Sequence, residues 1–255
     1  MSWPPQLPEA VQVHAYPLLF ATISGAHLYG FPSPDSDWDL RGVHVLPARE
    51  VLGLQTTQDT ISFERLEDGL ELDLVTHDAA KFFALMLRRN GYVLEQLHSP
   101  LVVHTTSEHA ELRELAWGCV TRYHAHHYLG FSANQWRLFS KESPQRIKPL
   151  LYTFRTLLTG LHLMRTGEIE ANLQVLNQEA RLPYLDDLIG RKTTEAEQTT
   201  LTGEVTFYEA EYRRLTEALV QARDKSVLRD EVPTDTQHAL SDLLVRVRLK
   251  EVWAQ

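Results

Sequence analysis

Cysteine is almost absent from this sequence, and long apolar runs are missing altogether. Cys119 is the only cysteine among 255 residues, which excludes an internal disulfide and a zinc site built from cysteine ligands. No apolar run approaches the roughly 20 residues that cross a bilayer. The N-terminal stretch MSWPPQLPEA lacks the basic and then apolar layout of a signal peptide. We therefore expect a soluble cytoplasmic protein that makes no membrane contact.

Positive charge is scarce as well. The chain has 25 Lys and Arg against 34 Asp and Glu, for a net charge of -9. This balance disfavours binding of nucleic acid through bulk charge, although it does not exclude a local basic groove. The sequence has no repeat and no low-complexity linker. Its hydrophobic content of 43% is that of an ordinary globular chain with one large domain or two smaller ones.

The first 105 residues alternate between short apolar runs and turn signals. Asp68-Gly69 supplies a positive-φ turn between two alternating runs, which predicts a hairpin. The helix after the hairpin has Thr76 or His77 near its N-cap and Gly91 at its end. The predicted elements are strands at 18–23 and 40–46, a hairpin at 61–76 and a helix at about 78–89.

Beyond about residue 105 the pattern is helical. Apolar residues recur at helical spacing, and Gly or Pro separates the periodic segments. The predicted helices span residues 108–117, 121–140, 149–165, 205–226 and 235–253. The chain is therefore expected to divide into a small mixed domain, 1–105, and a helical domain, 106–255.

Two aspartates stand two positions apart in the stretch ISGAHLYGFPSPDSDWDLRG, residues 23–42. Asp37 and Asp39 lead into a predicted strand, so their side chains point to the same face. Two carboxylates at this spacing repel each other, and a divalent cation between them relieves the repulsion. The alternative is a solvated acidic turn, which is the commoner interpretation of an isolated Asp-x-Asp.

Other features near the pair favour a phosphoryl-transfer site. A strand ends at Ser24, and the backbone N–H groups of the helical turn that begins at Gly25 can hold a phosphate. Asp73 lies between two leucines in the hairpin, where a carboxylate is costly unless its face is polar or binds metal. Glu71 shares that face. A phosphate turn, a carboxylate pair and a third carboxylate from a neighbouring strand are the components of a two-metal site.

The spacing resembles the signature of the DNA polymerase β-like nucleotidyltransferase superfamily, which is Gly-Ser, about ten residues, Asp-x-Asp and a distal acidic residue. Here Gly25-Ala26 is followed by ten residues and then by Asp37-Trp38-Asp39. The longer text SGAHLYGFPSPDSDWDLRGVHV is similar to a bacterial branch of predicted nucleotidyltransferases found among RNA-repair enzymes. The resemblance continues through GLELDLVTHDAAKFFALMLRRNGYVLEQL and, more weakly, through KPLLYTFRTLLTG.

The resemblance implies a fold and a reaction. The fold is α+β, with a polymerase β-like palm of mixed sheet and helices followed by a helical C-terminal domain. The reaction moves a nucleoside monophosphate from an NTP to a hydroxyl acceptor and releases pyrophosphate. The resemblance further implies that Asp37 and Asp39 bridge two Mg²⁺ or Mn²⁺ ions. Asp73 would complete the site of the ion that activates the acceptor.

Nucleotide contacts are expected in the turn formed by Ser24, Gly25, Ala26 and His27. The family's serine is Ala26 here, which keeps the backbone N–H but loses a hydroxyl bond to the terminal phosphates worth roughly 1.5–3 kcal/mol. His27 or a basic residue elsewhere would compensate for that loss. Arg41 shares the strand face of the carboxylates, where it either contacts a phosphate or neutralises the cluster.

A local reversal of charge marks the helix predicted at 149–165. Between Ser143 and Gly167 there are basic residues and no acidic one. Lys148, Tyr152 and Arg155 are spaced i, i+4, i+7 and share one helix face. Such a face would bind a triphosphate, with Tyr152 against the base or sugar. The alternative is a solvated basic face, or ion pairs with acidic helices.

The acceptor follows only from the resemblance, which makes an RNA 3′ end the leading choice. One alternative is nucleotidyl transfer, such as AMP transfer, to a protein or a small molecule. Another is a catalytically inactive palm that binds nucleotide or RNA. Ala26 supports the inactive palm, while the three acidic candidates oppose it. Nucleotide preference and oligomeric state are not predicted.

Overall fold

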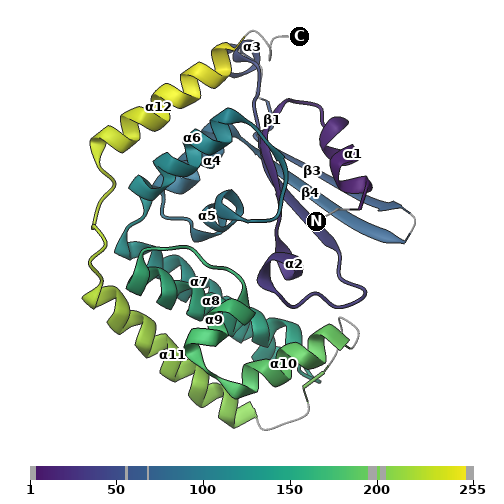
Figure 1. Cartoon of the computed structure of the whole chain (residues 1–255), viewed down its shortest axis with the longest axis vertical. Coiled ribbons are helices and arrows are strands. Elements are labelled where there is room, and N and C mark those ends of the chain that lie inside the picture. The colour runs from purple at the N-terminus through teal and green to yellow at the C-terminus, as the bar shows by residue number, and fades with distance from the viewer. Residues whose placement is uncertain (1–3, 55–56, 68, 195–199, 202–204, 251–255) are drawn as a thin grey trace. The chain divides into compact units, whose positions relative to one another are not determined.

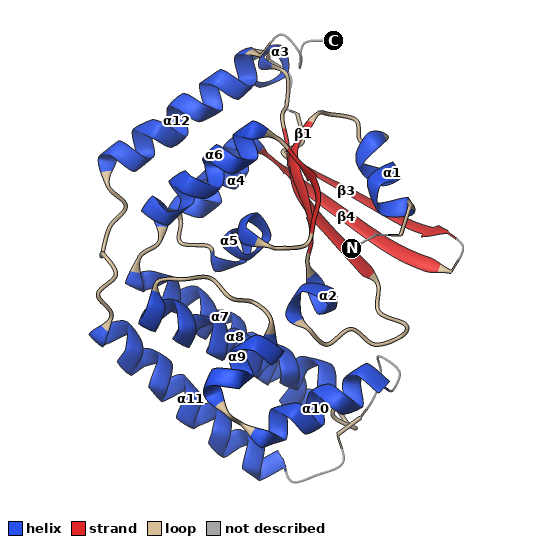
Figure 2. Cartoon of the chain, viewed as in Figure 1, coloured by secondary structure: helices blue, strands red, loops and turns tan. Residues whose placement is uncertain are grey.

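Five strands form one mixed sheet in this computed structural model of the chain (Figures 1 and 2). The strand order is β3-β4-β2-β1-β5, with β2 and β4 parallel and the other neighbouring pairs antiparallel. The strands are β1 (Leu18–Ile23), β2 (Trp38–His44), β3 (Thr60–Glu67), β4 (Leu70–Asp78) and β5 (Val102–Thr105). The mixed sheet and its many helices confirm the predicted α+β class.

The chain packs into two units, each assembled from separate stretches of sequence. The first comprises residues 1–25, 37–119 and 231–255, and the second comprises 26–36 and 120–230. The division at residue 105 expected from the sequence stays a prediction, because packing units and independently folding domains are different properties. The structure describes residues 4–54, 57–67, 69–194, 200–201 and 205–250.

The hairpin of β3 and β4 is confirmed. Glu67 pairs with Leu70 at its closed end, and the antiparallel register continues to Thr60 opposite His77. Gly69 has a φ of +79°, the left-handed conformation that glycine adopts without penalty. Asp68, its partner in the predicted turn, lies outside the described residues.

Helices cover both faces of the sheet in the first unit (Figure 1). On one face α1 (Gln6–Gln12) packs Leu7 and Ala10 into a core with Leu40, Leu72 and Leu74. The other face is covered by α4 (Ala79–Leu87), α5 (Gly91–His98) and α6 (Ser107–Ala116), while α3 (Ala48–Leu52) follows β2 along the chain. Burial of these apolar side chains is the main stabilising term of the unit.

The predicted start of the helix after the hairpin is close, but its predicted end is wrong. Asp78 caps α4, because its carboxylate accepts the N–H of Ala80 at 3.0 Å. Thr76 and His77 lie within two residues of this cap, in the last part of β4. Gly91 does not end this helix; it begins α5, whose cap is Asn90. The signal at Gly91 therefore marks the start of a helix and not the end of one.

The helix α12 (Thr234–Leu249) belongs to the first unit although it comes last in the chain. Arg248 donates to Asp78 at 2.5 Å and to the carbonyl of Leu46 at 2.6 Å. The Asp78 side chain is 4% exposed. The same carboxylate thus caps α4 and binds α12, which fastens the C-terminal helix to the sheet unit.

The second unit is helical. Its helix α8 (Ile147–Thr166) is buried along almost its whole length because α7, α9, α10 and α11 pack around it. These surrounding helices are α7 (Ala125–Lys141), α9 (Leu173–Ala180), α10 (Pro183–Thr194) and α11 (Val205–Lys225). None of the helices in the described part of the chain combines the length and the apolar character needed to cross a bilayer.

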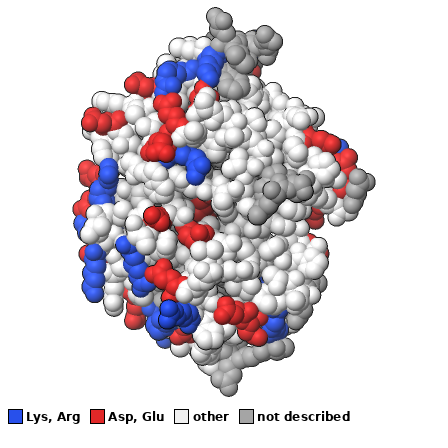
Figure 3. Space-filling view, in the orientation of Figure 1, with Lys and Arg blue, Asp and Glu red and all other residues white. Residues whose placement is uncertain are grey.

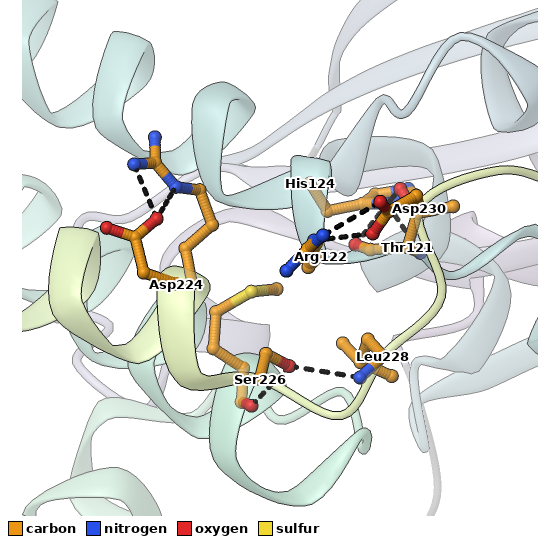
Figure 4. A network of polar contacts seen from close by, with 9 residues as sticks. Thr121, Arg122, His124, Asp224, Ser226, Leu228 and Asp230 are labelled. Carbon is orange, nitrogen blue, oxygen red and sulfur yellow. Dashed lines mark hydrogen bonds and ion pairs between the residues drawn. The ribbon is translucent and has the colours of Figure 1, made fainter.

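Polar contacts fix the segment that leaves α11 (Figure 4). The Ser226 hydroxyl donates to the carbonyl of Met164 at 2.8 Å and accepts the N–H of Leu228 at 3.3 Å. Further on, Asp230 accepts a bond of 2.7 Å from Arg122. These bonds therefore hold residues 226–230 against the helical unit.

Candidate active site

Asp39 on β2 and Asp73 on β4 are direct register partners in adjacent parallel strands. Register partners project to the same face of a sheet. Their chain neighbours Leu40, Leu72 and Leu74 point into the α1 core, so the two carboxylates lie on the opposite face. The structure thus brings together two of the three carboxylates predicted as metal ligands.

The guanidinium of Arg41 lies between these carboxylates. Its Nη2 is 2.5 Å from Oδ1 of Asp39 and 2.8 Å from Oδ2 of Asp73. Its Nη1 donates to the carbonyls of Leu40 and Asp73, and its Nε donates to the hydroxyl of Tyr92. These five bonds equal the number of N–H groups on a guanidinium. A contact between Arg41 and a phosphate would require one of them to break.

Arg41 keeps its charge in this setting. Burial alone lowers the pKa of Arg41, but Tyr92, Asp39 and Asp73 raise it above the ordinary value. The side chain is 12% exposed, so solvent screens the ion pairs weakly. Of the two roles expected for Arg41, the geometry shows the one that neutralises the carboxylates.

The turn after β1 lies in close contact with the side chain of Asp39. The short helix α2 (Gly25–Tyr29) begins at Gly25 with a φ of +59°, and a Cβ there would lie 1.8 Å from Oδ2 of Asp39. The N–H of Ser24 donates to the carbonyl of Asp39 at 2.8 Å. The Ser24 hydroxyl is buried and has no hydrogen-bond partner among the described residues. The predicted phosphate turn and the carboxylate pair therefore meet at Asp39.

Asp37 stands directly before β2 and is half-buried. Its side chain makes no hydrogen bond or ion pair with any described residue. No three His, Cys, Asp or Glu side chains within the described ranges form a set that could hold a metal ion. The structure therefore does not gather Asp37 together with Asp39 and Asp73.

Glu64 is a carboxylate near the pair that the sequence interpretation missed. It is the register partner of Asp73 on the other side of β4, so Glu64, Asp73 and Asp39 form a row across three strands. The tight turn at Gly69 sets this register, and counting back from it would have found Glu64. Glu71, the alternative third carboxylate, is exposed and pairs with Leu66.

The remaining turn residues belong to the second unit. Ala26 is 4% exposed, so its methyl group packs inside the protein, and His27 is half-buried. Further along α2, the ring of Tyr29 lies beneath Arg155, with the guanidinium carbon 3.9 Å from the ring centre. Arg155 is 2% exposed. It therefore holds α2 against α8 instead of forming a basic surface.

Lys148 and Tyr152 share a hollow of about 290 Å³ in the second unit. Both side chains are half-buried, and the ring of Tyr152 meets those of Tyr29 and Phe31 edge to face. The hollow is lined by Gln135, Leu138, Arg146, Lys148, Pro149 and Tyr152. Two of the three residues expected on one helix face thus line one hollow, and Arg155 does not.

Basic and acidic side chains are interspersed on the face drawn in Figure 3. Ion pairs within single helices contribute to such a pattern: on α11, Arg213 lies 2.5 Å from Glu209 and Arg214 lies 2.7 Å from Glu211. These exposed pairs add little to stability. They reduce the net positive charge that the helix offers to a nucleic acid.

Comparison with known proteins identifies the family of this chain. A family model described as the RNA repair pathway DNA polymerase beta family, RlaP, matches residues 5–246. The chain belongs to this family. The resemblance noted in the sequence is thereby confirmed, and the family match extends it beyond residue 160, where the sequence analysis found no similarity, to residue 246.

Two similar proteins carry the description "uncharacterized", and a third is a solved structure. The protein MJ0002 of Methanocaldococcus jannaschii is 30% identical over 155 residues, which are 60% of this chain and 63% of that protein. The chain thus spans less than two thirds of that relative's length. YcgL of Bacillus subtilis is 25% identical over 262 aligned positions, covering 97% of this chain and 95% of YcgL. A solved nucleotidyltransferase-like protein from Exiguobacterium sibiricum is 12% identical, with a TM-score of 0.33 over 96% of this chain and 81% of its own.

Proposed function

We propose that the chain is a metal-dependent nucleotidyltransferase. It would transfer a nucleoside monophosphate from an NTP to a hydroxyl acceptor, an RNA 3′ end, and release pyrophosphate. Membership of the RlaP family supports nucleotidyl transfer. The observation that carries the proposal is the pairing of Asp39 with Asp73 beside the turn at Gly25.

Mg²⁺ or Mn²⁺ fits the chemistry of this pair. Carboxylate oxygens are the hard ligands that these ions prefer, and oxygens of Asp39 and Asp73 already approach one common atom, Nη2 of Arg41. Asp37, two residues before Asp39, is the third proposed ligand. Bound ions would polarise the triphosphate, stabilise the leaving pyrophosphate and lower the pKa of the acceptor hydroxyl.

The chain itself would supply position and charge, with no protein nucleophile. The acceptor oxygen attacks the α-phosphorus, the bond to the pyrophosphate oxygen breaks and the hydroxyl proton passes to solvent. Asp39 and Asp73 would hold the cations, while Arg41 keeps the two carboxylates at a fixed separation. The backbone after Ser24 is the proposed phosphate contact.

The hollow lined by Lys148 and Tyr152 is a separate candidate for nucleotide contact within the second unit. It combines one ammonium group with one aromatic ring, the groups that recognise a phosphate and a base. Arg155 is no longer part of this proposal because it lies buried against Tyr29.

The RNA acceptor rests on the description of the family as part of an RNA repair pathway. Transfer of AMP to a protein or a small molecule would use the same carboxylates. A panel of acceptors therefore separates transfer to RNA from transfer to protein.

A second candidate is a palm that binds nucleotide or RNA without catalysis. The observation that favours it is Ala26, whose buried methyl group replaces the family's serine. Without that hydroxyl, phosphate binding at the turn rests on backbone N–H groups. The same residues would then bind a ligand without activating it.

The test uses the whole purified chain with each radiolabelled NTP, Mn²⁺ or Mg²⁺, and a panel of RNA, DNA and protein acceptors. The proposal predicts label on RNA, release of pyrophosphate and loss of both with a chelator. Label on protein alone identifies the other acceptor class. Binding of NTP without transfer to any acceptor identifies the binding module.

A further inference from the structure

The loop that precedes Asp37 is held by helices far away in the sequence. Residues 30–36, GFPSPDS, belong to the second unit together with α9 and α10. The side chain of Gln174 donates to the carbonyl of Gly30 at 2.5 Å. A Cβ on Gly30 would lie 2.3 Å from Oδ1 of Asn172, so α9 approaches the loop backbone as closely as a glycine permits.

Lys192 of α10 makes the most unusual of these contacts. The side chain is fully buried, with 0% exposure, and its Nζ donates to Oγ of Ser33 at 2.5 Å. Burial of an ammonium group costs several kcal/mol unless hydrogen bonds and charges compensate. An apolar side chain of similar length would fill the same space without that cost. The lysine therefore calls for a role other than packing.

Ser33 also forms hydrogen bonds with Ser36 at the end of the loop. Its hydroxyl lies 2.9 Å from the hydroxyl of Ser36, which in turn accepts the N–H of Ser33 at 2.9 Å. The N–H of Ser36 donates to the carbonyl of Ser33 at 3.0 Å. The ammonium of Lys192 thus binds one end of a closed turn, and the next residue after that turn is Asp37.

We propose that Lys192 is a positioning residue that fixes the turn of residues 33–36 and thereby the chain leading into Asp37. The predicted effect on turnover rests on the function proposed above. The predicted effect on the turn does not depend on that function. The proposal gives α10, which carries no recognised motif, a function in holding the turn that precedes Asp37. Lys192 touches no substrate; it acts through Ser33.

The test separates positioning from packing by comparing two variants of neighbouring cations. Lys192→Met keeps the volume and removes the charge. Arg191→Met is the matched control, because Arg191 lies on the same helix but its Nη2 donates to the carbonyl of Thr200. Hydrogen exchange of the Ser33 and Ser36 amides, measured by NMR, reports the turn directly. Thermal unfolding reports the fold.

The proposal predicts that Lys192→Met unfolds no earlier than the wild type, while both amides exchange about tenfold faster or more, the effect of losing one hydrogen bond to a charged group. Arg191→Met should leave both amides unchanged. If Lys192→Met fails to fold, Lys192→Gln takes its place, since it removes the ammonium group and leaves the contact between the Ser33 and Ser36 hydroxyls in place. Wild-type exchange at Ser36 in whichever variant folds would overturn the proposal.

Turnover gives the second measurement. Lys192→Met should lower kcat for nucleotidyl transfer at least tenfold with little change in KM for NTP, because the turn leads to a proposed metal ligand and not to the nucleotide. An effect on KM alone would contradict the positioning role. A wild-type chain without transferase activity would refute the proposed function, and the amide exchange would still decide the role of Lys192.

Discussion

Asp39 and Asp73 face each other across two parallel strands, and one nitrogen of Arg41 lies 2.5 Å from the first and 2.8 Å from the second. Two carboxylates in this position repel each other. The positive charge of the guanidinium therefore offsets the repulsion between the two carboxylates. The site therefore carries its own positive charge.

Replacing Arg41 by methionine tests this relationship. We expect Arg41→Met to lower the free energy of unfolding by about 3 kcal/mol near pH 7, the effect of leaving a partly buried charge without its partner. Urea unfolding of variant and wild type near pH 7 measures this loss. The double variant Arg41→Met with Asp73→Asn should recover part of it, because it removes one of the two repelling carboxylates. An equal loss in the single and the double variant would contradict this explanation.

The turn at Gly25 offers a test of close approach. Gly25→Ala adds a Cβ 1.8 Å from Oδ2 of Asp39 at a φ of +59°. Gly69→Ala is the control, since Gly69 has a φ of +79° but nothing within 4 Å of the added Cβ. We expect a loss of about 1 kcal/mol for the control, from backbone strain alone, and about 2 kcal/mol or more for Gly25→Ala. Similar losses in denaturant unfolding would show that Asp39 moves aside without cost.

The C-terminal helix provides a matched pair of arginines. Arg248 binds Asp78, whose side chain is 4% exposed, whereas Arg246 pairs with Glu111 on the surface. We expect Arg248→Met to destabilise the fold by about 3 kcal/mol, because Asp78 stays buried without its cation. Arg246→Met should leave the unfolding midpoint unchanged. If Arg248→Met unfolded like the wild type, α12 would not be fastened to the sheet unit by this contact.

Buried and half-buried histidines make the fold sensitive to acid. Burial is the largest cause that lowers the pKa of each of four histidines to about 4: His44, His98, His109 and His127. In the unfolded chain they titrate near 6.5, so between these values the unfolded state binds more protons. Stability is therefore greatest above pH 6.5 and falls as the pH drops toward 4.

Thermal unfolding from pH 7.5 to pH 4.5 measures this decline. His109→Gln, which replaces one of the four with a group that does not titrate, should show a shallower slope than the wild type. A melting temperature that stays constant or rises over this range would contradict the assignment of buried, neutral histidines.

Local pattern was enough to predict the hairpin and part of the site. The turn at Gly69 fixes the register of its two strands, and spacing by two residues places Arg41 on the face of Asp39. These relations depend on neighbours along the chain or on a single tight turn. The same logic applied to Glu64 would have found it opposite Asp73.

Contacts between distant segments could not be predicted from local pattern. The pairing of Asp39 with Asp73 depends on β2 meeting β4 in parallel, which no turn between them dictates. The helical spacing of Arg155 predicted a basic face, but the packing of α8 inside its unit buries that residue. Lys192 meets Ser33 across 159 positions of sequence, and an isolated lysine gives no sign of burial.

We propose Asp39 and Asp73 as the cation-holding pair of a nucleotidyltransferase. The most direct measurement compares the rate of labelled nucleotide transfer to an RNA 3′ end for the wild type, Asp39→Asn, Asp73→Asn and Glu71→Gln at saturating Mn²⁺. Glu71 shares the face of Asp73 but is exposed, which makes it the control. We expect a loss of at least a hundredfold for the first two variants and a rate near that of the wild type for Glu71→Gln. Near wild-type transfer by Asp39→Asn, or a greater loss in Glu71→Gln than in Asp73→Asn, would contradict this proposal.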